Sequence, residues 1–458
     1  MVLAVSDQAR QAGVRPGMRR GGALMLVPDI GLHERAPVQE AEALHAVAMA
    51  LLQYTPQVTE GEEATLLLDV GASLRLFGGI RRLCSLVRAS MAALGFTAVL
   101  GVAPTARGAW LLARSGAGRS LTIERMERRL HGLPVGLLPP ARPYLAWLEG
   151  IGCLTVGELM RLPRPGLQRR CGRALLDVLD AARGHTAEMF GWIAAPPSFV
   201  AKLELFGRIE DADLLLAGAR RLLLQMTGWL CARQFAVERI SLLLEHERGR
   251  VARPPTAIDI VLAEPVWRDD HLVRLLKEKL AKLELEAPVI GLCLEALQVR
   301  PMAPHSDSLF PEPGGSKEDR QRLFELLVAR LGTDNVLQAA PRADHRPEHA
   351  NGWAPVQDKL RPGDVAAALP PGSLPRPAWL LAKPIALLVR DHRPFYCSPL
   401  RMVSSAERIE AGWWGETQTR DYFIAQGEDN AHYWVYRERL PGTDDDAEPR
   451  WYLHGLFG

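Results

Sequence analysis

The sequence predicts a multidomain α+β protein, and three patterns support this fold class. Residues 66–70, Leu-Leu-Leu-Asp-Val, form a short apolar run that ends at a glycine, which is typical of a strand buried on both faces. Residues 196–300 alternate strand-like and helix-like segments in a β-α-β-β-α-β order. Beyond residue 377, aromatic and polar residues alternate, which predicts a small β-rich region. The chain of 458 residues, 48% of them hydrophobic, can bury several cores.

The composition predicts a soluble, cytoplasmic protein with no metal and no cofactor. No apolar run approaches the roughly 18 residues of a membrane-spanning helix, and the N-terminus carries no signal-peptide pattern. The six cysteines have no C-x-x-C spacing and no nearby set of histidines, so neither a zinc site nor a disulfide framework is predicted. The net charge of +2 says little about nucleic acid, so any DNA contact must come from local basic patches.

Three helices and one strand are predicted in the first hundred residues. Residues 2–18 have a strand-like start, a short helix that stops at Gly13 and a Pro-Gly turn. Residues 39–53 are apolar at helical spacing. An acidic, turn-like stretch at residues 59–63 precedes the strand at 66–70, and residues 80–94 predict a further helix.

Residues 66–79, LLLDVGASLRLFGG, resemble the palm of the Y-family translesion DNA polymerases, and within that family they look most like the ImuB branch. The resemblance extends over nearly the full chain. A complete member has a palm strand with a metal-binding aspartate upstream of the fingers, whereas nothing here precedes Met1. We expect a missed upstream start rather than a palm that lacks this strand, because the missing edge would leave backbone groups unpaired.

The resemblance implies a division of the chain into seven segments. They are a fingers-like segment (1–35), a palm-like segment lacking its first strand (36–132), a helical thumb with a helix-hairpin-helix (133–195), an α/β little finger (196–300), a linker (301–315), a helix with a Pro-rich connector (316–376) and a C-terminal aromatic-rich region (377–458). Within the sixth segment, residues 317–337 predict the helix, and the proline-rich residues 340–376 predict a flexible or extended connector.

The residues that catalytic members of the family use are replaced here. A tyrosine that holds the incoming triphosphate corresponds to Asp7. Adjacent aspartate and glutamate, which bind paired magnesium ions, correspond to Ala64 and Thr65. An asparagine-lysine pair corresponds to Thr105 and Ala106. The resemblance therefore implies a protein with no catalytic residues and no metal site.

The alternative is an active translesion polymerase with displaced carboxylates, supplied by Glu60, Glu62, Glu63 or Asp69. A two-metal site tolerates little displacement, and a shift of one residue along a strand moves the side chain to the other face. We therefore favour a solvated acidic turn for the glutamates and a structural role for Asp69.

Residues 148–159 have the pattern of a helix-hairpin-helix, in which glycines allow backbone N–H groups to approach a DNA phosphate. Thr155 and Glu158 have the spacing of a capping box at the second helix. A basic run through a Pro-Gly turn follows, and a thumb without a DNA role is the alternative. The predicted DNA-binding residues are Gly150, Ile151, Gly152, Arg161, Arg169 and Arg170. Further phosphate contacts from the little finger are expected of Arg208, Arg233, Arg239 and Arg253.

The linker contains Ser306, Leu309 and Phe310. Bacterial proteins that bind the sliding clamp carry a peptide with glutamine, two variable residues, leucine and phenylalanine at this place. The resemblance therefore implies a clamp-binding peptide in which Ser306 replaces the glutamine. The alternative is that Leu309 and Phe310 pack back onto the little finger.

The C-terminal region contains the tryptophans that we expect to matter most, Trp413, Trp414, Trp434 and Trp451. Core packing is the default role for large side chains in a small sheet, and partner binding is the more specific prediction.

Taken with the family, these features imply a non-catalytic DNA-binding adaptor of an SOS-induced mutagenic translesion synthesis complex. Its partners would be damaged or primer-template DNA, the sliding clamp, a RecA-related accessory protein and an error-prone C-family DNA polymerase, with no membrane partner. A protein scaffold that no longer binds DNA is a further alternative, which a missing salt-dependent DNA affinity would indicate.

Overall fold

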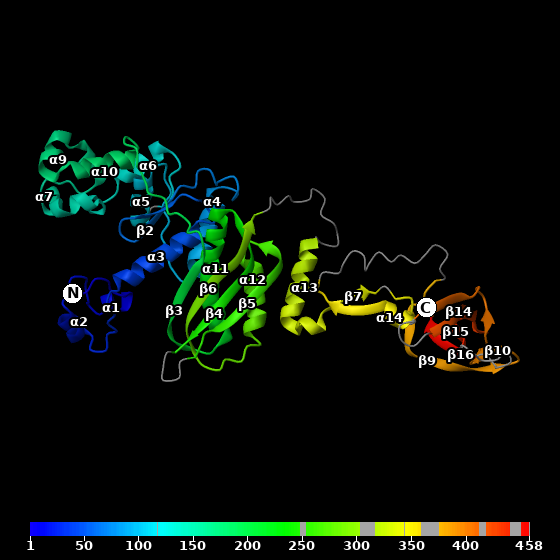
Figure 1. The fold of residues 1–458 in the computed structure, drawn as a ribbon. Helices are drawn as coiled ribbons and strands as arrows, with labels where there is room; N and C mark the ends of the chain where they lie inside the picture. The colour runs from blue at the N-terminus through cyan, green and yellow to red at the C-terminus, as the bar shows by residue number, and fades with distance from the viewer. Residues whose placement is uncertain are drawn as a thin grey trace. The chain divides into compact units, whose positions relative to one another are not determined.

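The computed structural model describes residues 1–116, 118–247, 253–302, 317–342, 344–358, 375–411, 418–439 and 450–457. They form two compact units, whose elements are labelled in Figure 1. The first unit comprises Met1–Val261, Pro265–Val273 and Glu284–His305, and the second comprises Leu262–Glu264, Arg274–Leu283 and Ser306–Gly458. No helix within the described ranges is long and apolar enough to cross a membrane.

Helices dominate the first 131 residues: α1 (Asp7–Gln11), α2 (Arg20–Leu26), α3 (Pro37–Leu51), α4 (Ile80–Ala93), α5 (Ala106–Arg114) and α6 (Ile123–His131). After α1 the chain turns at Gly13, whose φ is 92°. α3 and α4 confirm the helices predicted over residues 39–53 and 80–94, with ends shifted by one or two residues. Their apolar sides share a buried cluster with Leu224, which lies far along the chain.

The strand predicted over residues 66–70 is one arm of a short hairpin, not a strand buried on both faces. β2 (Thr65–Leu68) pairs antiparallel with β1 (Val58–Gly61), and each of its residues is only half-buried. Residues 59–61 of the acidic stretch belong to β1 and not to a turn. Glu63 and Ala64 lie in the turn with φ of 55° and 52°.

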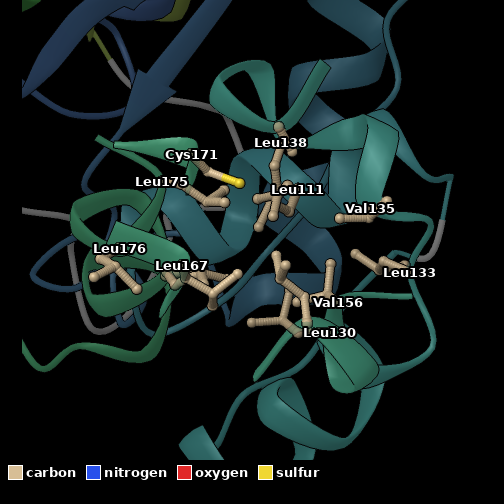
Figure 2. Close-up of a cluster of buried hydrophobic side chains, with 14 of the residues drawn as sticks. Leu111, Leu130, Leu133, Val135, Leu138, Val156, Leu167, Cys171, Leu175 and Leu176 are labelled. Atoms are coloured by element: carbon tan, nitrogen blue, oxygen red, sulfur yellow. The ribbon is translucent and has the colours of Figure 1, made fainter. Parts of the chain in front are cut away.

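The thumb segment consists of two 3₁₀ turns, Val135–Leu137 and Pro139–Tyr144, and four helices: α7 (Leu145–Gly150), α8 (Val156–Arg161), α9 (Arg164–Cys171) and α10 (Arg173–Arg183). Figure 2 shows their leucines, with Cys171, converging with side chains of α5 and α6 on one buried core. The turn predicted at Pro165-Gly166 is wrong, because both residues lie in the first turn of α9. Backbone N–H groups in the first turn of a helix have no helical acceptor, so a proline there costs no hydrogen bond.

The predicted β-α-β-β-α-β order is confirmed. The elements are β3 (Val200–Ile209), α11 (Ala212–Arg233), β4 (Phe235–His246), β5 (Thr256–Val266), α12 (Asp269–Leu280) and β6 (Val289–Pro301). The four strands pair antiparallel in the order β3-β6-β4-β5, and α11 packs against β3, β4 and β6. α12 ends at Leu280, whereas the sequence predicts this helix over residues 271–285.

α11 also packs against α3 through Gly228. A Cβ atom added at Gly228 would lie 1.9 Å from the backbone oxygen of Met49 and 3.0 Å from the carbonyl carbon of Ala50. Any side chain here would therefore overlap backbone atoms, which cannot rotate away. Glycine at this position lets the helix of the little-finger segment contact the helix of the palm-like segment directly.

The segment that begins at residue 317 differs from the prediction. α13 (Lys317–Leu331) ends six residues early, because Gly332 has a φ of 91° and the Asn335 side-chain amide donates to the Leu331 carbonyl at 2.9 Å. A 3₁₀ turn (Thr333–Asn335) follows. Part of the predicted extended connector is folded, since β7 (Leu337–Pro341) and β8 (Asn351–Pro355) pair antiparallel around the one-turn helix α14 (Pro347–Ala350). Residues 359–374 lie outside the described ranges.

The predicted C-terminal β-rich region is confirmed as an eight-stranded sheet. Its strands are β9 (Trp379–Arg390), β10 (Arg393–Tyr396), β11 (Ser398–Pro399), β12 (Arg401–Met402), β13 (Glu407–Ala411), β14 (Gln418–Gln426), β15 (His432–Arg439) and β16 (Trp451–Leu456). The order is β11-β10-β9-β16-β15-β14-β12, with β13 also paired to β14. Large side chains fill its core: Trp434 stacks on Tyr422 with ring centroids 4.1 Å apart.

A buried carboxylate joins the strands at one edge of this sheet. Asp421 on β14 is only 1% exposed and accepts hydrogen bonds from Arg408 at 2.8 Å, Arg437 at 3.0 Å and Arg439 at 2.9 Å. Burial alone would raise the pKa of Asp421, but the hydrogen bonds from the three arginines outweigh it and lower the pKa from 3.8 to about 2.

The depressed pKa of Asp421 predicts a defined acid sensitivity. The ionised carboxylate should contribute about 2 kcal/mol of stability, fully present above about pH 4 and lost as the pH falls towards about 2, because the unfolded chain binds the proton more tightly. Denaturant unfolding of the wild type and of Asp421→Asn checks this. The stability difference between them should shrink below pH 4, and a difference that stays constant down to pH 3 would contradict the prediction.

Candidate nucleic-acid interface

The predicted helix-hairpin-helix is present in the thumb segment. α7 ends at Gly150 and α8 begins at Val156, and Gly152 between them has a φ of 75°. The side chain of Ile151 is 49% exposed, and a Cβ added at Gly150 or Gly152 would meet nothing within 4 Å. The turn is therefore an open surface that a DNA backbone can approach without steric obstruction.

The backbone N–H groups of this turn already have hydrogen-bond partners within the protein. The N–H groups of Ile151, Gly152 and Cys153 donate to carbonyls of α7 at 3.2, 2.9 and 2.8 Å. The capping box at α8 is confirmed, and its Glu158 carboxylate accepts from both Leu154 N–H and Thr155 N–H at 2.9 Å. These hydrogen bonds lower the pKa of Glu158. The N–H groups just before α8 thus already bind a carboxylate.

The arginines after the turn differ in the partners that their side chains contact. Arg161, Arg169 and Arg170 are all exposed. Arg170 lies 5.3 Å from the ring centroid of Trp147, whereas Arg169 has no hydrogen-bond or ion-pair partner in the described part of the chain. Arg164 is committed to a two-point contact with Asp180 at 3.0 and 2.6 Å. Arg161 also has no such partner, but its charge lies close enough to the Glu158 carboxylate to help lower the pKa of Glu158. Arg169 is therefore the cation of this run with the least local compensation.

Replacing Arg169 with glutamine should weaken DNA binding by about three- to tenfold, the effect of one charge-assisted contact of roughly 1 kcal/mol. The slope of log affinity against log salt should fall by about one, because one fewer phosphate is neutralised. Fluorescence anisotropy with labelled primer-template DNA at several salt concentrations measures both quantities. Arg20→Gln on α2, which removes an equally exposed and unpaired charge, is the matched control. Equal effects of the two variants would contradict a specific role for Arg169.

Most of the cations proposed on the little finger are held by carboxylates. Arg208 pairs with Glu247 at 2.6 Å, Arg239 with Asp259 at 2.7 Å, and Arg253 with Glu286 at 2.8 Å. Arg233 lies 5.5 Å from the ring centroid of Phe235. The structure therefore gives these side chains local partners and does not gather them into one basic surface.

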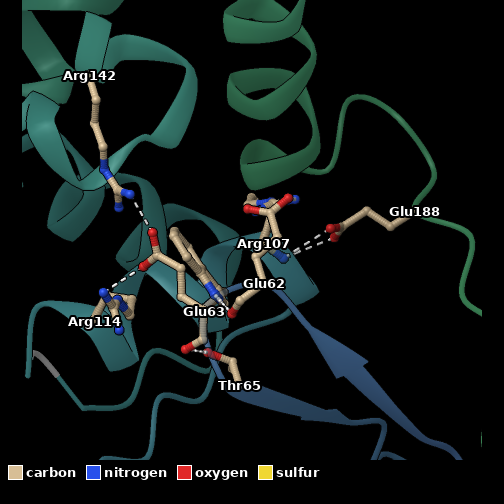
Figure 3. A network of polar contacts seen from close by, with 8 residues as sticks. Glu62, Glu63, Thr65, Arg107, Arg114, Arg142 and Glu188 are labelled. Carbon is tan, nitrogen blue, oxygen red and sulfur yellow. Dashed lines mark hydrogen bonds and ion pairs between the residues drawn. The ribbon is translucent and has the colours of Figure 1, made fainter. Parts of the chain in front are cut away.

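Arginines surround the carboxylates that could replace a polymerase metal site (Figure 3). Glu63 pairs with Arg114 at 2.5 Å and with Arg142, and the Arg142 hydrogen bond and the Arg114 charge lower the pKa of Glu63. Glu62 pairs with Arg107 at 3.2 Å. Three fixed positive charges beside two carboxylates leave no excess negative charge for a pair of divalent cations.

The remaining carboxylates of this region are also engaged. Glu60 lies 3.6 Å from the imidazole of His45, and Asp69 accepts from the N–H of Gly71 at 3.0 Å. Within the described ranges, no group of three or more His, Cys, Asp or Glu side chains is placed to hold a metal. Together with Ala64 and Thr65, this arrangement does not fit a two-metal site.

The triphosphate position of the fingers is similarly altered. Asp7 and Arg10 face each other on α1, with their side chains 3.2 Å apart. Asp7, which corresponds to the triphosphate-holding tyrosine of the family, thus forms an ion pair with a neighbouring arginine of its own helix.

The predicted clamp and partner sites are only partly described. Ser306, Leu309 and Phe310, and also Trp413 and Trp414, lie outside the described residues. Trp434 is fully buried, so the prediction that it contacts a partner directly is wrong. Trp451 is half-buried and packs against Phe423, with the two ring centroids 5.4 Å apart.

Two features of the first unit were missed from the sequence. Arg142 reaches Glu63 across 79 positions of the chain, and no local pattern could predict that contact. A group of arginines on α4 and α6 also lines open pockets. Their helical spacing, with Arg81 and Arg88 on α4 and Arg125, Arg128 and Arg129 on α6, was the available signal.

Comparison with known proteins agrees with the resemblance found in the sequence. Residues 1–114 match the model of the impB/mucB/samB family. Two curated relatives, Protein ImuB of two strains of Caulobacter vibrioides, are 28% identical over 470 residues, covering 97% of this chain and 100% of each relative. The predicted resemblance is confirmed: the chain is similar to ImuB proteins over nearly its full length, and its first 114 residues match the impB/mucB/samB family model.

Solved structures of low similarity include Y-family polymerases. A ternary complex of Dbh has a TM-score of 0.35 and 17% identity, covering 64% of this chain and 88% of that chain. A DinB-family error-prone DNA polymerase from Sulfolobus solfataricus has a TM-score of 0.35 and 17% identity, covering 66% and 92%.

Proposed function

We propose that this protein is a non-catalytic DNA-binding adaptor of an SOS-induced mutagenic translesion synthesis complex. In this role it links primer-template DNA to the sliding clamp and to an error-prone C-family polymerase, together with a RecA-related accessory protein. The partner polymerase performs the synthesis, while this chain positions that polymerase through its contacts with the DNA and the clamp.

The observation that carries the proposal is the ion-pair cluster around Glu62 and Glu63. At the palm position where catalysis needs uncompensated carboxylates, the chain has Ala64 and Thr65, and the adjacent glutamates are neutralised by arginines. Metal-assisted phosphoryl transfer requires negative charge that attracts Mg²⁺ and places it between two oxygens. The arrangement here supports a palm that has kept its fold and lost that chemistry.

DNA contact is supported by the exposed helix-hairpin-helix turn and by Arg169. Clamp contact rests on Leu309 and Phe310, and recruitment of the polymerase and the accessory protein rests on the C-terminal region, including Trp413 and Trp414. These contacts are the parts of the proposal that need direct binding measurements.

Primer extension by the purified full chain, with magnesium and separately with manganese, tests the proposal beside DNA binding at two salt concentrations. We expect salt-sensitive binding and no extension. Glu62→Ala and Glu63→Ala are the decisive variants, because they remove the carboxylates that an active enzyme would have to use. Extension by the wild type that is lost in either variant would establish the active-polymerase alternative. Binding that does not respond to salt would support the scaffold alternative.

A further inference from the structure

Two adjoining open pockets lie between α4, residues 118–121 and α6. Their volumes are about 450 and 520 Å³, and they share Arg81, Arg119 and Arg129. Together they are lined by six arginines, which we call the arginine pocket: Arg81, Arg88, Arg119, Arg125, Arg128 and Arg129. No residue of the helix-hairpin-helix belongs to this group, so it is a separate basic surface of the first unit.

The charges of the arginine pocket are not compensated by carboxylates that line it. Neither pocket has an acidic lining residue among the described positions. The side chains of Arg81, Arg88, Arg119 and Arg125 have no hydrogen-bond or ion-pair partner within the described ranges. This contrasts with the palm and the little finger, where arginines of the same unit pair with Glu62, Glu63 or Glu247. Like charges gathered in one concavity repel one another and raise the local concentration of anions.

A buried hydroxyl group also faces this site without a partner. Ser120 lines the first pocket, is only 3% exposed, and its Oγ has no hydrogen-bond partner. A buried hydroxyl normally finds a partner, because leaving it unsatisfied costs about 1–3 kcal/mol. Ser120 immediately precedes Leu121 and the cap residue Thr122 of α6, whose N-terminal end adds a partial positive charge. A hydroxyl donor beside several guanidinium groups is the donor set of a phosphate site.

We propose that the arginine pocket binds phosphate groups, with Ser120 Oγ and the guanidinium groups of Arg81, Arg119 and Arg125 as donors. The volumes admit more than one phosphate, as in a run of phosphodiester backbone or a free oligophosphate. Both sources offer the same oxyanion chemistry, and guanidinium groups match it through paired N–H donors. The site is additional to the DNA contact proposed for the thumb and does not depend on it.

The test uses the full chain, inorganic tripolyphosphate as the free-phosphate probe, and labelled primer-template DNA. The first variant is Arg81→Gln/Arg119→Gln, and its matched control is Arg20→Gln/Arg75→Gln, which removes two exposed, unpaired charges elsewhere in the first unit. Calorimetry with tripolyphosphate and anisotropy with DNA are measured for each protein. We expect at least tenfold weaker binding of one or both ligands to the pocket variant only, as the loss of two charge-assisted contacts implies.

The pattern of losses identifies the source. Weaker DNA binding, with or without weaker tripolyphosphate binding, assigns the site to a nucleic-acid backbone. Weaker tripolyphosphate binding alone assigns it to a free phosphate compound. If both affinities change no more than in the control variant, the arginines are a solvated helix surface and the proposal is wrong. Failure of the adaptor function would appear separately, as primer extension.

Ser120→Ala provides a second, independent test. A serine that only filled space would leave phosphate affinity unchanged. If Ser120 is a ligand donor, Ser120→Ala should weaken binding of the phosphate ligand about threefold or more, while the ligand-free protein should be no less stable, because an unsatisfied hydroxyl is removed. Unchanged affinity together with reduced stability would overturn the assignment of Ser120.

Discussion

Gly228→Ala is expected to destabilise the first unit by about 2–3 kcal/mol. The added Cβ would lie 1.9 Å from the Met49 backbone oxygen, so α3 and α11 must move apart. The separation would loosen the buried cluster that both helices share through Val47, Leu51 and Leu224. Neither helix can relieve the overlap by a change of rotamer, because the clash involves only backbone and Cβ atoms.

Gly166→Ala is the matched control, since Gly166 also lies in a helix but a Cβ there would meet nothing within 4 Å. This variant should be neutral or more stable by up to about 1 kcal/mol, because alanine favours the helix. Denaturant unfolding gives the stabilities, and hydrogen exchange of α3 and α11 locates the effect. If the two variants changed stability by the same amount and in the same direction, the close helix crossing would not exist as described.

Trp434→Ala should cost the C-terminal sheet about 3–5 kcal/mol, the usual effect of removing a large buried aromatic side chain. Trp434 is fully buried, stacks on Tyr422 and His454, and lies beneath Arg376, whose guanidinium is 5.1 Å from its ring centroid. The cavity would be lined by rigid rings that cannot collapse into it. Near-ultraviolet circular dichroism and limited proteolysis of the full chain should show a loosened C-terminal region.

Trp379→Ala is the control for Trp434, because Trp379 begins β9 and is 71% exposed. It should change stability by less than about 0.5 kcal/mol. The comparison also decides how partner-binding data are interpreted: a partner lost only in Trp434→Ala is lost because the sheet is damaged. Equal stability losses in the two variants would contradict the core position of Trp434.

Local patterns predicted the elements whose residues specify them without help from distant parts of the chain. The helix at 80–94 follows from apolar spacing, the α8 cap from Thr155 and Glu158, and the C-terminal strands from alternating aromatic residues. The predictions are wrong where a single residue, or a partner far along the chain, determines the local structure. Gly332 ends α13 despite continuing leucines, and a Pro-Gly pair that usually marks a turn begins α9 instead.

The candidate sites likewise combine features that the sequence predicts with features that only the fold creates. Substitution at Ala64 and Thr65 was visible in the sequence, but the neutralisation of Glu63 was not, because Arg114 and Arg142 lie far from it in the chain. The open turn at Gly150 to Gly152 was predictable, whereas the use of its N–H groups within the protein depends on detailed backbone geometry. Burial of Trp434 likewise required the strand pairing of β14, β15 and β16.

The contact of α3 with α11 affects how the chain folds during its synthesis. Leu224 completes a cluster with Val47, Leu51 and Leu83, so a nascent chain that has left the ribosome only as far as the thumb cannot yet close this core. Domains usually fold as units during synthesis, in order from the N-terminus. Here the cluster of α3 and α4 is completed only when α11 has emerged, so fragments that stop before residue 212 should expose more apolar surface on α3 than the full chain does.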